Sequence, residues 1–300
     1  MFPIKPMEPI QTEAMLSSDE WIYQVKWDGV RILAYLEDGQ VRLWNRKKAE
    51  RTAQYPELVT ELKGISCRSA VLDGEVIVVH RGRADFFQVL KRDLLQNPRK
   101  IQAAYQAIPV QFQLFDLLHI NGEDLVKHAW EQRDEQLRLL LEKTQTERIA
   151  VTDSFADGNA LWHATRERGW EGIVMKRKTS PYRVGQKHAD WRKVKHFRTL
   201  MAHLVGASFK KGRVNALLLG VEEAGGWYYI GRAASGLSEQ ELTLLTEWIP
   251  QLQVASPAVV NPVYDPQVIW IRPSFSVKVR YLEWTPHGTL RSPTILGFNA

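Results

Sequence analysis

Segments in which apolar and polar residues alternate recur through the first two thirds of the chain, and this period of two predicts half-buried strands. Asp-Gly pairs, which favour tight turns, interrupt these segments at 28–29, 38–39 and 73–74. We therefore expect strands joined by turns over residues 21–44, 70–79 and 109–125, the last with an Asn-Gly turn, and a buried strand over 171–176.

Other segments repeat apolar residues every three or four positions, which is the spacing of an amphipathic helix. The first of them has a proline near its start, where a helix accepts one. The helices expected from this spacing cover residues 55–63, 84–95, 131–143 and 158–169.

The composition changes between residues 177 and 198, where the chain is basic, nearly free of acidic residues and interrupted by proline and glycine. Short strands with glycine-rich turns follow, together with a helix at about 238–248. About five strands and a helix within about 100 residues suit a small barrel such as an OB-fold. We therefore place a domain boundary near residue 196.

With 44% hydrophobic and 25% charged residues, the chain has the composition of an ordinary globular protein. Its net charge of +6 indicates a polyanionic partner only if the basic residues cluster. Cys67 is the single cysteine, which excludes disulfides and cysteine-built zinc sites and fits a reducing compartment. The sequence has no apolar stretch long enough to span a bilayer. We expect a cytoplasmic protein that does not associate with membranes.

A lysine two residues before the first Asp-Gly pair, Lys26, suggests chemistry at that point. A lysine is ordinarily a protonated ammonium at neutral pH, but cationic neighbours, a metal or desolvation favour the neutral amine. A neutral amine can attack a carbonyl or a phosphorus centre. Attack on the α-phosphate of a nucleotide would need cations to balance the phosphoryl charge and carboxylates to hold Mg²⁺.

Side chains suited to these tasks stand at the ends of predicted elements. Lys193 and Lys195 alternate along one segment, so a strand there would point both to the same face. The candidates of this kind are Arg31, Arg46, Glu75, Glu171, Lys193 and Lys195.

The segment KWDGVR (26–31) matches the Lys-x-Asp-Gly-x-Arg signature of the covalent nucleotidyltransferases, which comprise DNA ligases, RNA ligases and mRNA-capping enzymes. The chain resembles in particular the ATP-dependent DNA ligases of bacterial end joining, which work with Ku. Further segments follow in the order of that family: NR (45–46), LDGE (72–75), FQLFDLL (112–118), EGIVMK (171–176), WRKVK (191–195), YIGRAASGL (229–237) and the stretch 272–293.

The resemblance implies that Lys26 is the nucleophile that becomes the lysyl-AMP. It implies that Glu75 approaches the ribose, and that Glu75 and Glu171 serve the metal, Mg²⁺ or Mn²⁺. Arg31 and Arg46 are expected to contact the nucleotide or the 5′-phosphate at the nick.

The resemblance also implies a binding site for ATP. Phe115 is expected to stack on adenine, although its apolar surroundings fit packing in a core equally well. Lys176, Lys193 and Lys195 are expected to bind the nucleotide, the last two through its phosphates. Gln24 stands where relatives have glutamate, and its amide oxygen can still accept from the amino group of adenine.

The fold implied is α+β: an adenylyltransferase domain over 1–195, with a nucleotide cleft between antiparallel sheets and flanking helices, and an all-β OB-fold barrel over 196–300. Nicked or broken double-stranded DNA is the expected substrate, sealed in repair by end joining. We expect a minimal, monomeric ligase at the nucleoid, without a preceding DNA-binding domain. Ku and a repair polymerase on a separate chain are the expected partners. An NAD-dependent ligase would need a further module and zinc-binding cysteines.

The sequence departs from the family at its end, where Asn299 stands in place of an arginine that helps to position pyrophosphate. Self-adenylylation is then expected to be weak unless Arg280 and Arg291 suffice. Two alternatives stay open: an RNA ligase or capping-type enzyme, and a non-catalytic module that binds DNA ends.

Overall fold

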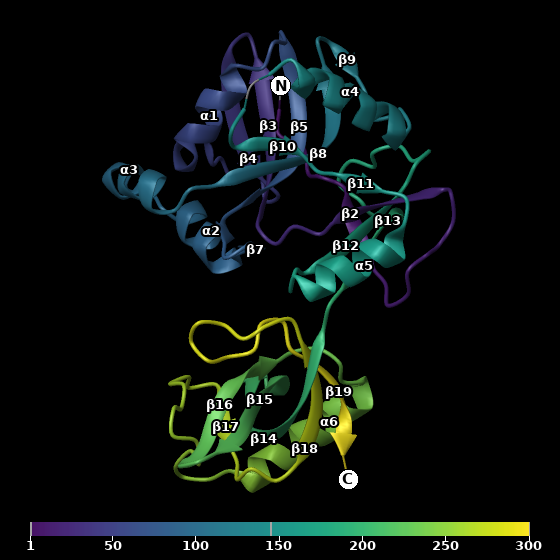
Figure 1. Ribbon diagram of the computed structural model, residues 1–300. Helices are drawn as coiled ribbons and strands as arrows, with labels where there is room; N and C mark the ends of the chain where they lie inside the picture. Colours follow the sequence, from purple (N-terminus) through teal and green to yellow (C-terminus); the bar gives the residue numbers. More distant parts are fainter. Residues whose placement is uncertain (1, 145, 300) are drawn as a thin grey trace. The chain divides into compact units, whose positions relative to one another are not determined.

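The chain divides into two compact units, one ending at Lys195 and the other beginning at His196 (Figure 1). The computed structural model describes residues 2–144 and 146–299. The expected fold class is confirmed: an α+β unit of mainly antiparallel sheets with flanking helices, followed by an all-β barrel region.

Two large sheets face each other in the described part of the first unit. Sheet A has the strand order β1 (Glu8–Gln11), β13 (Lys187–Lys195), β12 (Gly172–Arg177), β2 (Trp21–Val25) and β11 (Ser154–Phe155). Sheet B has the order β10 (Ile149–Val151), β8 (Gln111–Ile120), β5 (Ser69–Ile77), β3 (Val30–Glu37) and β4 (Gln40–Asn45), with β9 (Glu123–Asp124) on β8. Only the edge pairs β1–β13 and β10–β8 are parallel within these two described sheets.

Helices cover the outer faces of both sheets. Apolar side chains pack between the two inner faces. Leu58, Leu137 and their neighbours pack helices against sheet B, whereas Leu161 packs a helix against sheet A. Between the sheets, Ile22 of sheet A and Leu33 of sheet B belong to one apolar cluster. The helices are α1 (Pro56–Lys63), α2 (Phe86–Asp93), α3 (Pro98–Ala107), α4 (Trp130–Glu142) and α5 (Gly158–Glu167), with a 3₁₀ turn at Thr52–Gln54 and a short hairpin of β6 (Val79–His80) and β7 (Arg83–Ala84).

Two of the three predicted Asp-Gly turns are wrong. Asp38 and Gly39 have positive φ angles and join β3 to β4, as a tight hairpin requires. In contrast, Asp73 and Gly74 lie inside the continuous central strand β5, which pairs with both β3 and β8. The pair at 28–29 joins strands of different sheets, because β2 belongs to sheet A and β3 to sheet B.

The helix α3 was not expected from the spacing of apolar residues. Its start carries a clear signal, since the Asn97 side chain accepts from the backbone N–H groups of Arg99 and Lys100 and Pro98 occupies the first turn. No helix within residues 2–144 and 146–299 has the length and apolar character needed to cross a bilayer.

The second unit is a curved sheet with a helix. Its strands follow the order β16-β15-β14-β18-β19, with β17 on β14. Backbone hydrogen bonds from Leu290 N to Ile230 O (2.7 Å) and from Ile295 N to Ser235 O (2.9 Å) connect the two ends of the sheet and close the barrel. The elements are β14 (Arg198–Lys210), β15 (Arg213–Glu223), β16 (Gly226–Ala233), α6 (Glu239–Trp248), a 3₁₀ turn (Ile249–Leu252), β17 (Val268–Trp270), β18 (Ser276–Tyr281) and β19 (Thr294–Asn299).

A buried ion pair holds α2 to α1 beneath sheet B, and its loss should destabilise the first unit. Arg92 is fully buried, bonds the Glu57 carboxylate at 2.8 Å and donates to the Ala104 and Ile108 carbonyl oxygens. Removing one partner of such a pair leaves an unpaired buried charge, so we expect Arg92→Met to lower the free energy of unfolding by about 3–5 kcal/mol in urea denaturation.

The matched control is Arg99→Met, because Arg99 is exposed on α3. It should change the free energy of unfolding by less than about 0.5 kcal/mol. Equal unfolding curves for the two variants would contradict this account of the pair.

Candidate active site

The chain crosses from sheet A to sheet B between Val25 and Val30, and Lys26 stands at the start of this crossing. The Lys26 N–H donates to the Gly172 carbonyl oxygen at 2.9 Å, which extends the pairing of β2 with β12 by one residue. A Cβ atom at Gly29 would lie 2.2 Å from the Val76 carbonyl oxygen on β5. Glycine is needed at position 29 for this close approach between backbones.

The register of sheet A brings three of the expected residues together at one end of neighbouring strands. Glu171 immediately precedes β12, and its neighbour Gly172 pairs with Lys195 at the end of β13. The Glu171 carboxylate accepts from Lys195 Nζ at 2.7 Å through Oε1 and from Lys26 Nζ through Oε2. The nearly buried carboxylate therefore lies between two ammonium groups.

These charges fix the resting protonation states. Burial alone would lower the pKa of Lys26, but the carboxylates of Glu171, Glu75 and Asp28 together raise it above its ordinary value. Burial opposes ionisation of Glu171, yet the ammonium groups of Lys26 and Lys195 hold its pKa below the usual range. At rest Lys26 is thus a charged ammonium, not a nucleophile.

Glu75 is the second carboxylate near Lys26. It lies on β5 opposite Arg31 of β3. Burial raises the pKa of Glu75 to about 8, although the positive charges of Lys26 and Arg31 act in the opposite direction. Burial thus disfavours the ionised form of Glu75, and further positive charge nearby would favour it.

Lys193 follows the alternation expected for β13, since Val194 between it and Lys195 is buried on the other face. Burial and the like charges of Lys26, Lys195 and Lys187 lower the pKa of Lys193 to about 8. This group of lysines gives the face a concentration of positive charge suited to phosphates.

Arg31 is held within the protein by a network that the sequence analysis did not identify. Its guanidinium makes two bonds to the Asp73 carboxylate, at 2.9 and 2.6 Å, and donates to the Met7 carbonyl oxygen at 2.7 Å. The Tyr182 hydroxyl donates to the same carboxylate at 2.6 Å. Asp73 was visible inside LDGE, but nothing in the sequence placed Tyr182 beside it.

Gln24, Phe115 and Lys176 lie deeper between the sheets. The Gln24 side chain is buried, and its Nε2 donates to Ser154 Oγ at 3.1 Å. Phe115 is half buried, with the Arg31 guanidinium carbon 5.1 Å from its ring centroid. Lys176 is buried, and its Nζ donates to the Phe115 carbonyl oxygen at 2.7 Å.

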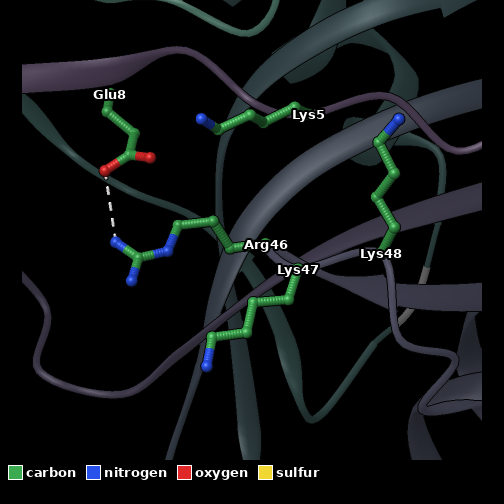
Figure 2. A pocket seen from close by; sticks show the side chains of 5 residues that line it. All are labelled: Lys5, Glu8, Arg46, Lys47 and Lys48. Atoms are coloured by element: carbon green, nitrogen blue, oxygen red, sulfur yellow. Dashed lines mark hydrogen bonds and ion pairs between the residues drawn. The ribbon is translucent and has the colours of Figure 1, made fainter.

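Arg46 belongs to a separate basic cavity. It is exposed, and its Nη1 donates to Glu8 Oε2 at 3.2 Å. Figure 2 shows this pair with further lysine side chains around it. The cavity has a volume of about 490 Å³ and an excess of positive charge, and its lining residues are Lys5, Glu8, Arg46, Lys47 and Lys48.

The lysines of this cavity were missed in the sequence analysis. Lys47 and Lys48 directly follow Arg46 in a turn whose Asn45 side chain accepts from two backbone N–H groups. Their position directly after Arg46 could have identified them in the sequence as further candidates for this site. Lys5 is far away in sequence from the other lysines, and its carbonyl oxygen accepts from the Gly185 N–H at 2.7 Å.

The residues around Lys26 fit a divalent cation that is shared with a substrate. Mg²⁺ is commonly held by one or two carboxylates together with phosphate oxygens and water. Glu75 and Glu171 supply two carboxylates, and the part of the chain that the structure describes has no cluster of three or more candidate metal ligands. This donor set suits a cation that arrives with a nucleotide.

Arg280 and Arg291 lie in the second unit. The Arg280 guanidinium carbon is 4.9 Å from the centroid of the Phe197 ring, and Arg291 Nη1 donates to Glu283 Oε1 at 2.7 Å. Asn299 ends β19, and its side chain lies outside the described part of the structure.

Known proteins are similar to this chain in sequence. The "Multifunctional non-homologous end joining DNA repair protein LigD" of Mycobacterium tuberculosis is 32% identical over 294 residues, which cover 95% of this chain and 37% of the relative. The corresponding protein of Pseudomonas aeruginosa is 32% identical over 289 residues, covering 93% of this chain and 33% of the relative. The chain thus spans only about a third of the length of these relatives.

A solved structure supports the same relationship. The crystal structure of the ligase domain from M. tuberculosis LigD superposes with a TM-score of 0.57 at 30% identity, covering 98% of this chain and 95% of that one.

The family matches extend over both units. Residues 5–195 match the family described as "ATP dependent DNA ligase domain", and residues 210–299 match the "ATP dependent DNA ligase C terminal region". The resemblance drawn from the sequence is confirmed. The chain belongs to the ATP-dependent DNA ligase family.

Proposed function

We propose that this chain is the catalytic region of an ATP-dependent DNA ligase that seals 5′-phosphate and 3′-hydroxyl ends through a lysyl-AMP intermediate. The observation that carries the proposal is the arrangement of Lys26, Glu171 and Lys195 at one end of sheet A. A lysine at a carboxylate, with further lysines beside it, combines a nucleophile with the charges that phosphoryl transfer needs.

The reaction has three steps. Lys26, once it has lost a proton, attacks the α-phosphorus of ATP; a nitrogen–phosphorus bond forms and pyrophosphate leaves. An oxygen of the DNA 5′-phosphate then attacks the same phosphorus, and the bond to Lys26 breaks as its amine regains a proton. The 3′-hydroxyl finally attacks the 5′-phosphorus, loses its proton and releases AMP.

Glu75 and Glu171 are the residues proposed to hold Mg²⁺ or Mn²⁺, which when bound would supply positive charge to the transferring phosphoryl group. Lys193 and Lys195 would contribute positive charge from the end of β13. The raised pKa of Glu75 supports this assignment, because a carboxyl group destabilised by burial gains most from a nearby cation.

The adenosine part of ATP would lie between the sheets. Phe115 would stack on the base, with Arg31 as a cation fixed beside its ring. Because the Gln24 amide nitrogen already bonds Ser154, its oxygen is the group suited to accept from the adenine amino group. Lys176 is included in this site through its bond to Phe115.

Nicked or broken double-stranded DNA is the proposed substrate, with Arg46 and the basic cavity as contacts to its phosphates. Backbone contacts of this kind dominate affinity for DNA and make it depend on salt. The setting we propose is end joining by a monomer at the nucleoid, with Ku and a separate polymerase. This setting is supported by the names of the relatives and by the resemblance in sequence.

Sealing should require Lys26 and should distinguish this proposal from its alternatives. We expect Lys26→Ala to abolish sealing of a 5′-labelled nicked DNA duplex with ATP and Mg²⁺, measured on denaturing gels, because the mutant has no amine to carry AMP. Lys63→Ala, which changes an exposed lysine of α1, is the control and should seal normally. Preference for GTP or for nicked RNA would favour the capping-type or RNA ligase alternative. Binding without any sealing would favour the end-binding module.

The glycine of the crossing should matter for the rate of adenylylation. In Gly29→Ala the new Cβ atom would meet the Val76 carbonyl oxygen at 2.2 Å, so the backbone beside Lys26 must move. We expect adenylylation by radiolabelled ATP to slow by about a hundredfold, since small misplacements of reacting groups cost that much.

The control for Gly29 is Gly39→Ala in the β3–β4 turn. Gly39 has a φ of 75° and no atom within 4 Å of an added Cβ, so the substitution should cost about 1–2 kcal/mol of stability through backbone strain. The adenylylation rate of Gly39→Ala should equal that of the wild-type protein. A wild-type rate for Gly29→Ala would show that the close approach is unimportant.

The basic cavity should contribute to the salt dependence of DNA binding. Replacing Lys5, Lys47 and Lys48 together by alanine should reduce the slope of log affinity against log salt by about two to three, if each lysine neutralises one phosphate. A nicked duplex and fluorescence anisotropy at several KCl concentrations give this slope. Replacing the exposed Lys63, Lys91 and Lys100 removes the same charge elsewhere and should leave the slope nearly unchanged. Identical slopes for the two triple variants would exclude the cavity as a DNA contact.

A further inference from the structure

Lys176 is a buried ammonium without a carboxylate at hydrogen-bond distance among its described contacts. Its side chain is 1% exposed. Nζ lies 4.3 Å from the centroid of the Trp191 ring, 4.7 Å from that of Phe115 and 5.6 Å from that of Trp130. A buried charge is costly unless it is compensated, and here three aromatic rings, a carbonyl oxygen and the nearby carboxylates of Asp116, Asp134 and Asp73 supply the compensation.

The carbonyl oxygen that accepts from Lys176 belongs to Phe115, where the pairing of β8 with β5 is irregular. Along β5 and β8 the pairing passes from Asp73 with Asp116 to Gly74 with Leu114, so Phe115 is an extra residue without a partner on β5. Such a bulge disrupts the ladder locally and turns a side chain in a new direction, and bulges are common beside active sites. The bond from Lys176 Nζ to Phe115 O, 2.7 Å long, fixes the backbone of this bulge.

The same lysine therefore contacts Phe115 twice, at its backbone and at its ring. Trp191 also touches the ring, edge to face, with centroids 6.2 Å apart. Lys176 lies on β12 opposite Trp191 of β13, so sheet A holds the ammonium that fixes a residue of sheet B. With 1% exposure, Lys176 has no surface from which to bind a phosphate directly.

We propose that Lys176 is a positioning residue, which holds the Phe115 bulge so that the ring presents a fixed face to the adenine base of ATP. This inference rests on the proposed function, in which Phe115 stacks on adenine. It assigns Lys176 to the recognition of the base and leaves the phosphates to Lys193 and Lys195.

The test compares ATP with inorganic tripolyphosphate, which has no base. All variants carry Lys26→Ala, so that no adenylyl transfer occurs, and dissociation constants are measured by calorimetry with Mg²⁺. We expect Lys176→Met to weaken ATP binding about tenfold, as loss of a charge-assisted hydrogen bond would, and to leave tripolyphosphate binding unchanged. Lys178→Met, two residues along the chain, is the control and should bind both probes normally.

A double-mutant cycle separates positioning from direct contact. In a Phe115→Ala background, Lys176→Met should change ATP affinity less than about twofold, because the ring that it positions is gone. Independent, multiplying effects of the two substitutions would overturn the inference, and so would an equal loss of tripolyphosphate binding. If Phe115→Ala itself leaves ATP affinity unchanged, the ring does not bind the base and the inference fails with it.

A second variant covers the case in which Lys176→Met does not fold. Trp130→Phe keeps a ring beside the ammonium and removes an indole N–H that is buried without a hydrogen-bond partner among the described residues. Because phenylalanine attracts a cation less than tryptophan, ATP binding should weaken about two- to threefold with tripolyphosphate binding unchanged. An unchanged ATP affinity would contradict the role given to the aromatic rings around Lys176.

Failure of this inference can be told from failure of the proposed function. If the protein with Lys26 intact takes up an adenylyl group from ATP while the cycle is additive, only the role of Lys176 is wrong. If it takes up none, the proposed function itself is wrong.

Discussion

The site depends on how tightly the chain is held where it passes from sheet A to sheet B. Four residues make this crossing, and both of its ends are fixed by backbone contacts: Lys26 N–H bonds β12, and Gly29 lies against the β5 carbonyl of Val76. The crossing therefore brings a lysine to the edge between two facing sheets, where carboxylates from both can reach it. Glu171 comes from sheet A and Glu75 from sheet B.

The electrostatics of the resting site oppose the reaction that we propose for it. Glu171 holds Lys26 as an ammonium, and the same carboxylate also binds Lys195. A nucleophilic amine requires that this pairing be relaxed, which the charges of a bound nucleotide and its cation would do by competing for the same groups. In the proposed reaction the lysine would thus be stored in an unreactive form, and chemistry would begin only when its substrate is bound.

The residues that meet around Lys26 could be picked out from the sequence, because Lys26, Glu171 and Lys195 stand at strand ends in short, recognisable segments. The pairing of strands could not: residues 21–44 read as consecutive hairpins, yet β2 and β3 belong to different sheets. Positive φ angles distinguish the true turn at Asp38-Gly39 from the close approach at Gly29, and the sequence is the same Asp-Gly in both. Lys176 ends an apolar run, where a charge usually reaches solvent, so its burial depends on aromatic residues from distant elements.

The most direct test of the account is intact mass spectrometry after incubation with ATP and Mg²⁺, followed by peptide mapping. The protein should first be treated with pyrophosphate, so that any AMP acquired before purification is removed. The account predicts a gain of one adenylyl group, located on the peptide that contains Lys26. An adenylyl group on another residue, or none while nicked DNA is still bound, would contradict it.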